Sequence, residues 1–152
     1  MQYRKAKIID VEEIHGLLTH YANQGLLLPR PRVKLYENIR EFSVAEKDGK
    51  IVGVGSLHIM WKDLAEIRSL AVSPDHARQG IGKELVNIFL KEAEELCIPQ
   101  VFTLTYKPGF FEKCNFQHVE KEELPQKVWR DCIDCPQFPN CEEIAMITYL
   151  GG

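Results

Sequence analysis

The segment from Arg68 to Leu90 constrains the fold most, because it reads as an apolar strand, a short polar turn and a long amphipathic helix in direct succession. Amide N–H groups at the start of a helix have no acceptor within the helix, and the helix dipole favours negative charge there. Gly80 and Gly82 carry no Cβ, so the main chain of the turn can adopt unusual φ angles and approach an anion closely. Arg78 and Lys83 add positive charge. The segment therefore predicts a binding site for a pyrophosphate or a similar anion.

Two well-known phosphate motifs do not fit this turn. The P-loop pattern would need glycine in place of Ala77 and serine or threonine in place of Glu84, and the dinucleotide pattern would need a third glycine in place of Leu85. The helix that follows has one apolar face, which predicts that it packs on a sheet. That face consists of Ile81, Leu85, Phe89, Ala93 and Leu96.

The composition predicts one soluble domain, spanning residues 1–152. The chain has 45% apolar residues, 27% charged residues and a net charge of -3, with no basic stripe, so we expect no nucleic-acid partner. No apolar run reaches membrane-spanning length and the N-terminus lacks a hydrophobic signal core, which predicts no membrane partner and a cytoplasmic location. The count of five cysteines is odd and fits a reducing compartment better than a disulfide framework.

Hydrophobic periodicity and turn signals predict the other elements. Asp10 and Glu13 form a capping-box pattern for a first helix that ends at Gly25, and Asp48-Gly49 is the strongest hairpin signal. The predicted strands are 3–9, 42–46, 51–61, 64–72, 100–105, 116–119 and 144–150, and short helices are predicted from Pro31 onward and over 108–113.

The segment V-S-P-D-H-A-R-Q-G-I-G-K resembles the acetyl-CoA loop of the GNAT acyltransferases, usually written [QR]-x-x-G-x-[GA]. Gly80 and Gly82 fall on its fourth and sixth positions, whereas Ala77 replaces the usual Gln or Arg at the first. The order of the predicted elements is also similar to that of the family, so the resemblance covers essentially the whole chain. It implies the α/β (α+β) GNAT fold, a mixed, mostly antiparallel sheet splayed between its fourth and fifth strands, with helices on both faces.

The same resemblance implies that acetyl-CoA is the co-substrate and that it lies in the split of the sheet. Main-chain groups near the end of the fourth strand would pair with the pantetheine arm like an added strand, opposite a wall on the fifth strand. The residues expected to bind acetyl-CoA are Leu70, Ala71, Val72, Ala77, Arg78, Gln79, Gly80, Ile81, Gly82, Lys83, Leu104, Thr105, Phe110 and Phe111.

Acyl transfer to an amine needs a base for the amine, a donor for the thioester carbonyl and an acid for the leaving thiolate. Glu66 resembles the general-base glutamate of several GNAT enzymes, the alternative being a solvated strand carboxylate, and the N–H near Leu70 is the expected carbonyl donor. P-G-F-F-E-K-C-N-F resembles F-Y-E-K-x-G-F of the family, with Phe111 in place of the acid tyrosine and Asn115 in place of glycine. Tyr106 is the substitute acid, unless the thiolate leaves unassisted.

Three further stretches, 25–30, 104–111 and 127–146, together resemble the short bacterial N-acetylglutamate synthases, amino-acid acetyltransferases that begin arginine synthesis. The resemblance implies transfer to the α-amine of an amino acid, with L-glutamate favoured. An amino dicarboxylate needs at least two cationic or N–H clamps. Arg30, Arg68, Lys127 and Trp129 are the expected substrate-binding residues, with Arg68 on the same strand face as Glu66. For each arginine, a solvated or structural ion pair is the alternative.

Two other functions remain open at the level of sequence. One is acetyl transfer to a different small amine or to a protein amine. The other is a non-catalytic acyl-CoA-binding sensor domain, which the missing tyrosine favours. A homodimer also remains open.

The cysteines leave a metal site as an alternative that we do not expect. Cys132, Cys135 and Cys141 form a C-x2-C-x5-C pattern, and a structural zinc would need Cys114 or His118 as a fourth ligand. Without that ligand, reduced thiols or an adventitious disulfide are the expectation. A remaining cysteine, at position 97, is expected in the core because it ends the long helix in an apolar setting.

Overall fold

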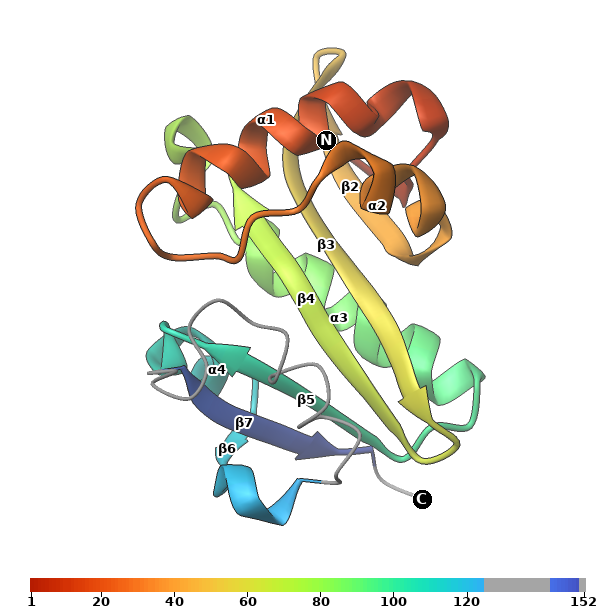
Figure 1. Ribbon diagram of the computed structural model, residues 1–152, viewed down its shortest axis with the longest axis vertical. Helices are drawn as coiled ribbons and strands as arrows, with labels where there is room; N and C mark the ends of the chain where they lie inside the picture. Colours follow the sequence, from red (N-terminus) through yellow and green to blue (C-terminus); the bar gives the residue numbers. More distant parts are fainter. Residues whose placement is uncertain (125–142, 151–152) are drawn as a thin grey trace. The chain divides into compact units, whose positions relative to one another are not determined.

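The computed structural model describes residues 1–124 and 143–150 (Figure 1). Its strands are β1 (Gln2–Lys5), β2 (Phe42–Lys47), β3 (Lys50–Trp61), β4 (Leu64–Val72), β5 (Gln100–Thr105), β6 (Gln117–His118) and β7 (Ile144–Tyr149). Its α-helices are α1 (Val11–Ala22), α2 (Arg32–Glu37), α3 (Ile81–Glu95) and α4 (Pro108–Lys113), and its 3-10 helices are η1 (Ile8–Asp10), η2 (Ile39–Glu41), η3 (Pro74–His76) and η4 (Lys121–Glu123). The predicted order of strands and α-helices is confirmed, although the first strand is shorter than predicted.

The strands form one seven-stranded sheet in the order β1-β2-β3-β4-β5-β7-β6. The pairs β1-β2, β2-β3, β5-β7 and β6-β7 are antiparallel, and β4-β5 is parallel. The parallel register joins Ala65 to Val101 and Glu66 to Phe102, near the starts of both strands. The predicted mixed, mostly antiparallel sheet is confirmed, and the predicted splay between the fourth and fifth strands stays a prediction.

The chain divides into two compact units. The first unit comprises Met1–His58 and Ile67–Lys91, and the second comprises Ile59–Glu66 and Glu92–Gly152. The core of the first unit contains Val11, Ile14, Leu18, Leu35, Phe42, Val44, Val54 and Ala71. The core of the second unit contains Leu64, Phe102, Leu124, Ala145 and Ile147. The expectation of a single domain stays a prediction.

In the first unit, helices cover both faces of the sheet. Residues of α1 and α2 pack with Val54 of β3 in the core of this unit. On the other face, a Cβ added at Gly53 would meet Ile81 of α3, and one added at Gly55 would meet Phe89, both at 2.7 Å. The glycines of β3 therefore let α3 pack closely on the sheet, so the start of α3 is held in place by its own buried face.

The β2-β3 hairpin and the start of α3 agree with local sequence signals. Asp48 and Gly49 form the two-residue hairpin loop with φ angles of 52° and 77°, as a turn with both central residues left-handed requires.

Two predictions at the C-terminal end of α3 are wrong, since neither Cys97 nor Leu96 is buried. Cys97 is exposed with a φ of 64°, because it is the left-handed residue that ends α3, and the next residue, Ile98, is buried instead. Leu96 is also exposed, one residue beyond the helix.

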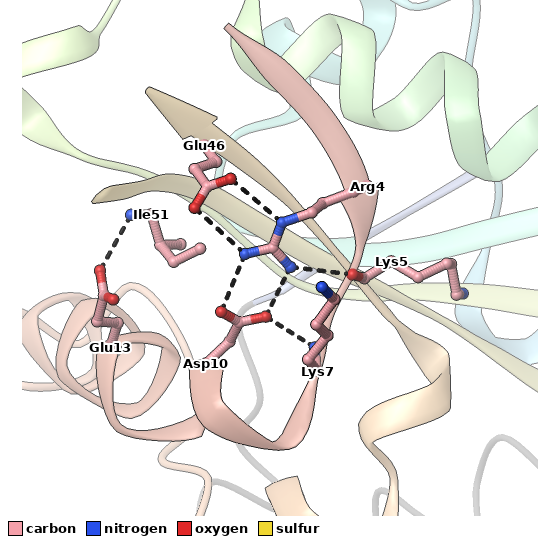
Figure 2. A network of polar contacts seen from close by, with 7 residues as sticks. All are labelled: Arg4, Lys5, Lys7, Asp10, Glu13, Glu46 and Ile51. Atoms are coloured by element: carbon pink, nitrogen blue, oxygen red, sulfur yellow. Dashed lines mark hydrogen bonds and ion pairs between the residues drawn. The ribbon is translucent and has the colours of Figure 1, made fainter. Parts of the chain in front are cut away.

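The predicted capping box at the start of α1 is also wrong, and Figure 2 shows why. Asp10 accepts two hydrogen bonds from the Arg4 guanidinium, at 2.7 and 3.0 Å, and one from the N–H of Lys7. Glu46 of β2 contacts the same guanidinium at 3.3 Å, and Glu13 accepts from the N–H of Ile51. A bidentate ion pair is stronger than a single hydrogen bond from a backbone N–H, so the Asp10 carboxylate binds Arg4 and links β1 to the helix start.

Candidate active site

The turn between β4 and α3 has the backbone that an anion site needs. Arg78 has a φ of 65° and Gly80 a φ of 81°, and the N–H of Glu84 donates to the carbonyl of Gly80 as the first α-helical hydrogen bond. The amides of residues 81–83 therefore have no acceptor within the helix. The sequence predicts unusual φ angles at Gly80 and Gly82. Gly82 is instead a buried residue of the first helical turn, and the left-handed residues of the turn are Arg78 and Gly80.

Side chains around this turn separate into two groups. Ile81 is buried and anchors the helix in the core, so its side chain serves packing. The other residues of this turn are exposed, namely Ala77, Arg78, Gln79, Gly80 and Lys83. Ala77 has an extended backbone. Two cations and the open main chain of a helix start are therefore accessible to a phosphate group, which the sequence predicts.

Ser69 of β4 has a φ of 55°, in the left-handed region, an irregularity that the sequence analysis missed and that we call the bulge. Ser56 Oγ of β3 donates to the carbonyl of Arg68 at 3.1 Å, and the N–H of Ser73 donates to the carbonyl of Val52 at 2.8 Å. Within residues 64–72, Ser69 alone has a left-handed φ.

One edge of the last part of β4 faces away from β3. Because the N–H of Ser73 points toward β3, alternation along the strand turns the N–H and C=O groups of Leu70 and Val72 to the opposite edge, and those of Ala71 toward β3. β5 pairs with an earlier part of β4. The main-chain groups of Leu70 and the N–H of Val72, rather than the groups of Ala71, therefore lie on the edge expected to pair with an added strand.

Tyr21 of α1 reaches this edge. Its hydroxyl donates a hydrogen bond to the carbonyl of Val72, and burial raises the pKa of the Tyr21 phenol, so the proton stays in place at neutral pH. The sequence predicts that Tyr21 lies on the buried face of the first helix and gives it no further role. The position of a tyrosine at the end of this face is the signal that could have predicted its hydrogen bond, because buried tyrosine hydroxyls usually have a partner.

Arg30, the expected carboxylate-binding residue, is brought to the bulge. Its Nε donates to Ser69 Oγ at 3.3 Å. Pro31, which follows directly, is the N-cap residue of α2 and is extended, which defines the path of the chain at Arg30. Arg68 is half-buried and directly precedes the bulge. In the first unit Arg30 therefore contacts Ser69, and Arg68 precedes Ser69 in the chain, although what the arginines bind stays a prediction.

Glu66, the expected base, is buried, with 8% of its surface exposed, and pairs in register with Phe102 of β5. This burial contradicts the alternative of a solvated strand carboxylate. Tyr106, the expected substitute acid, is half-buried and comes directly after β5. The hydroxyl of Thr105 accepts a hydrogen bond from the N–H of Lys107 at 2.8 Å, which fixes the turn that contains Tyr106.

The position expected for an acid tyrosine is part of an aromatic cluster. Phe111 is buried at 4% exposure, and its ring packs edge-to-face on Phe110 and Phe116. Asn115, at a position where the family has glycine, has a φ of 70°, which asparagine tolerates better than most residues. Asparagine at position 115 therefore preserves the left-handed backbone that glycine would allow, whereas phenylalanine at position 111 removes a proton donor. Leu104, the remaining expected acetyl-CoA contact, is partly buried against the core of the second unit.

Several predicted residues lie outside the described part of the chain. These are Lys127, Trp129, Cys132, Cys135 and Cys141. Among residues 1–124 and 143–150, no group of three or more His, Cys, Asp or Glu side chains is arranged to hold a metal ion. Of the two suggested further ligands, Cys114 is buried and His118 contacts Glu112 at 2.8 Å. None of the helices in the described ranges has the length and apolar character that crossing a membrane requires.

A strand, a glycine turn and an exposed helix start follow one another directly in the chain, and comparison with known proteins shows the class to which this arrangement belongs. Residues 12–116 match the acetyltransferase (GNAT) family. An uncharacterized N-acetyltransferase of Chlorobaculum tepidum is 39% identical over 147 residues, which cover 97% of this chain and 95% of that protein. The amino-acid acetyltransferase of Mycobacterium tuberculosis is 40% identical over 129 residues, covering 83% of this chain and 74% of that protein.

The fold is also found in a solved enzyme. The N-acetylglutamate synthase of Neisseria gonorrhoeae, complexed with coenzyme A and N-acetyl-glutamate, is 29% identical with a TM-score of 0.91 and covers 99% of this chain, which spans 35% of that protein. The chain belongs to the acetyltransferase (GNAT) family. It is an acetyl-CoA-dependent acyltransferase of the amino-acid N-acetyltransferase group.

Proposed function

We propose that the chain transfers the acetyl group of acetyl-CoA to the α-amine of L-glutamate, forming N-acetylglutamate and CoA in the cytoplasm as a step of arginine biosynthesis. The similarity to amino-acid acetyltransferases and to an N-acetylglutamate synthase supports an amino-acid acceptor. It does not by itself select glutamate, so the choice depends on the residues around the bulge of β4.

The observation that carries the proposal is the contact of Arg30 with Ser69. It places a guanidinium beside the residue that precedes Leu70, whose N–H is the expected donor to the thioester carbonyl. An acceptor that brings its amine to this carbonyl and carries a carboxylate nearby would be held by that cation. An amino acid has this chemistry, and a simple alkylamine does not.

The residues at the turn suit the phosphate end of acetyl-CoA. The main chain of residues 80–83 would hold the pyrophosphate, and Arg78 and Lys83 would neutralise its charge. The edge groups of Leu70 and Val72 would pair with the amide groups of the pantetheine arm. This arrangement leaves the thioester next to the bulge, where Arg30 lies.

The steps of the proposed reaction are assigned to the residues that the sequence indicates. Glu66 would accept a proton from the amino group of glutamate, so that the neutral nitrogen attacks the thioester carbonyl. The N–H of Leu70 would stabilise negative charge on the carbonyl oxygen. As the N–C bond forms, the nitrogen releases its second proton to water, and the C–S bond breaks with its electron pair on sulfur. The CoA thiolate then takes a proton from Tyr106 or from water.

The proposal is tested by measuring CoA thiol release with each of the twenty amino acids, followed by steady-state kinetics of Arg30→Ala. We expect glutamate to give the highest kcat/KM. The substitution should raise the acceptor KM about ten- to a hundredfold, the effect of losing a charge-assisted bidentate contact, and leave the acetyl-CoA KM nearly unchanged. Arg30→Lys should recover little, since an ammonium cannot reproduce the planar fork.

A matched control is Arg32→Ala. Arg32 lies two residues further along and forms an exposed ion pair with Glu12 at 2.9 Å, so its loss should leave both KM values unchanged. An acceptor KM that is equal in wild type and Arg30→Ala would exclude Arg30 from the site. Preference for an amine without a carboxylate would overturn the proposal as a whole, and absence of transfer to any amino acid would favour a protein amine or a sensor function.

A further inference from the structure

The C-terminal end of α1 fixes the start of the segment 23–30, which ends at Arg30. The N–H of Leu26 donates to the carbonyl of Tyr21 at 3.1 Å, and the N–H of Gly25 donates to the carbonyl of Ala22 at 3.0 Å. Gly25 has a φ of 73°. This pairing around a left-handed glycine is the Schellman motif, in which carbonyls of the last helical turn hold the first residues beyond it. The backbone of Tyr21 therefore helps to set the direction in which the segment leaves the helix.

The side chain of Tyr21 joins the same end of α1 to β4. Its hydroxyl donates to the carbonyl of Val72. Its ring packs against the core of the first unit, and so does the side chain of Leu27 in the segment itself. Moving the ring away would expose apolar surface, so the hydroxyl is held at Val72 by packing as well as by the hydrogen bond.

The other end of the segment 23–30 also contacts β4. Arg30 Nε donates to Ser69 Oγ at 3.3 Å. The segment is therefore attached near its start through Tyr21 and at its end through Arg30, in both cases to residues 69–72 of β4. A loop that is held at both ends has fewer conformations than a loop held at one end. Loss of the contact at Val72 would therefore lower the fraction of molecules in which Arg30 lies at Ser69.

We infer that Tyr21 is a positioning residue for the acceptor, because its hydrogen bond to the Val72 carbonyl keeps the segment 23–30, and with it Arg30, in place on β4. The inference rests on the proposed function, since the position of Arg30 matters only where the acceptor carries a carboxylate. Tyr21 acts through Arg30 and makes no contact with the acceptor itself. Its effect should therefore be found in the KM for the acceptor.

Two other roles for Tyr21 make different predictions. A purely structural tyrosine would lower the unfolding midpoint on loss of its hydroxyl and leave both KM values unchanged. A tyrosine that serves the cofactor edge of β4 would raise the KM for acetyl-CoA instead. A positioning residue that acts through Arg30 raises the acceptor KM only while Arg30 is present, and a double-mutant cycle measures this dependence.

The test compares Tyr21→Phe, Arg30→Ala and the double variant with wild type. Tyr21→Phe removes one oxygen and keeps the packed ring, so we expect the fold to be kept. It should raise the glutamate KM about three- to tenfold, the effect of about one hydrogen bond, with kcat and the acetyl-CoA KM nearly unchanged. In the Arg30→Ala background the same substitution should change the glutamate KM by less than about twofold. Tyr36→Phe is the matched control, since Tyr36 of α2 is 42% exposed, and it should behave as wild type.

Hydrogen exchange provides a readout that does not need turnover. The amides of Gly25 and Leu26 should exchange faster in Tyr21→Phe than in wild type, and Tyr36→Phe should leave their exchange unchanged. Each of three results would overturn the inference: an unchanged glutamate KM in Tyr21→Phe, an equal effect of this substitution with and without Arg30, or unchanged exchange at both amides.

Failure of the proposed function gives a different result. It is seen in the wild type, as absent transfer to glutamate. If the wild type uses another amino acid, the same cycle is measured with that acceptor and decides on Tyr21. If it uses none, the inference fails together with the proposed function, whereas additive effects in an active wild type overturn the inference alone.

Discussion

Ser69, Arg78 and Asn115 all have left-handed backbone without being glycine, with φ angles of 55°, 65° and 70°. Such a conformation costs most residues about 1–2 kcal/mol, so the surrounding contacts must hold it. Ser69 has its neighbour's carbonyl fixed by Ser56, and Asn115 follows the end of α4, where its N–H donates to the carbonyl of Glu112. Two of the three residues flank the expected acetyl-CoA site, which suggests that local strain and function coincide there.

Glu66 leads to a prediction on the pH dependence of turnover. Glu66→Gln should lower kcat by a factor of about 10² or more and leave acetyl-CoA affinity nearly unchanged, because a general base acts on the proton of the amine and not on the cofactor. Rates measured from pH 6 to 9 should rise more steeply in the variant, as free amine becomes available in solution. Calorimetry with acetyl-CoA is the control for binding. Wild-type rates across this range would exclude Glu66 as the base.

Asp10 leads to a prediction on stability in acid. The Arg4 guanidinium and the Lys7 N–H hold the pKa of Asp10 below its usual value. A carboxylate whose pKa is lowered by folding contributes stability above its unfolded pKa of about 4, and the contribution is lost as pH falls below that value. Asp10→Asn should therefore lower the free energy of unfolding by about 1.5–3 kcal/mol at pH 7, with the difference shrinking toward pH 3.

Urea unfolding at several pH values measures this effect, with Glu12→Gln as its control. Glu12 pairs with Arg32 on the surface, where both side chains are more than half exposed, so its loss should change stability by less than about 1 kcal/mol. A difference between wild type and Asp10→Asn that does not depend on pH would show that the ion pair with Arg4 is not its source.

At the scale of elements, the contact of β3 with α3 depends on glycine. A Cβ at Gly55 would lie 2.7 Å from the ring of Phe89 and 3.0 Å from Leu70. Gly55→Ala should therefore destabilise the protein by about 1–3 kcal/mol, the usual cost of overpacking. Gly16→Ala is the matched control, since Gly16 is an exposed position in α1 with no atom within 4 Å of an added Cβ. That variant should be more stable by about 0.5–1 kcal/mol.

Denaturant unfolding compares the two alanine variants directly. Because Leu70 contributes to the open edge of β4, Gly55→Ala should also weaken acetyl-CoA binding, whereas Gly16→Ala should not. Equal stabilities of the two variants would mean that α3 shifts freely on the sheet.

At the scale of the whole molecule, acetyl-CoA should stabilise the folded chain. A ligand that binds only the folded state at a hundred times its Kd adds about 2.7 kcal/mol, or about 5–10 °C in Tm for a chain of this size. Gly80→Val should abolish this shift. Gly80 has a φ of 81° and open space around its Cβ position, so valine there strains the turn without a clash in the core. Gly82 is unsuitable for this test, because it is buried in the first turn of α3.

Thermal unfolding with and without acetyl-CoA measures the shift, and the Tm of ligand-free Gly80→Val shows whether the fold is kept. A variant that folds and still shows the full shift would contradict an anion site at this turn.

The sequence by itself determined the order of elements, the β2-β3 hairpin and the turn before α3, because each follows from local rules. Periodicity along the chain identifies strands and helices, and Asp48-Gly49 and Gly80 allow backbone that few other residues adopt. The sequence also indicated Glu66 and Arg30, through their places in a pattern.

Only the tertiary structure decided which long-range partner each polar group takes. Asp10 could cap its own helix, but Arg4 of β1 lies close enough to give it a stronger, bidentate contact, and Glu46 of β2 accepts from the same guanidinium. The left-handed φ of Ser69 is not indicated by the sequence pattern, because an irregular residue in a strand depends on contacts with the neighbouring strand. Contacts between segments far apart in the chain therefore decide the partners, since each local alternative is worth only about 0.5–2 kcal/mol.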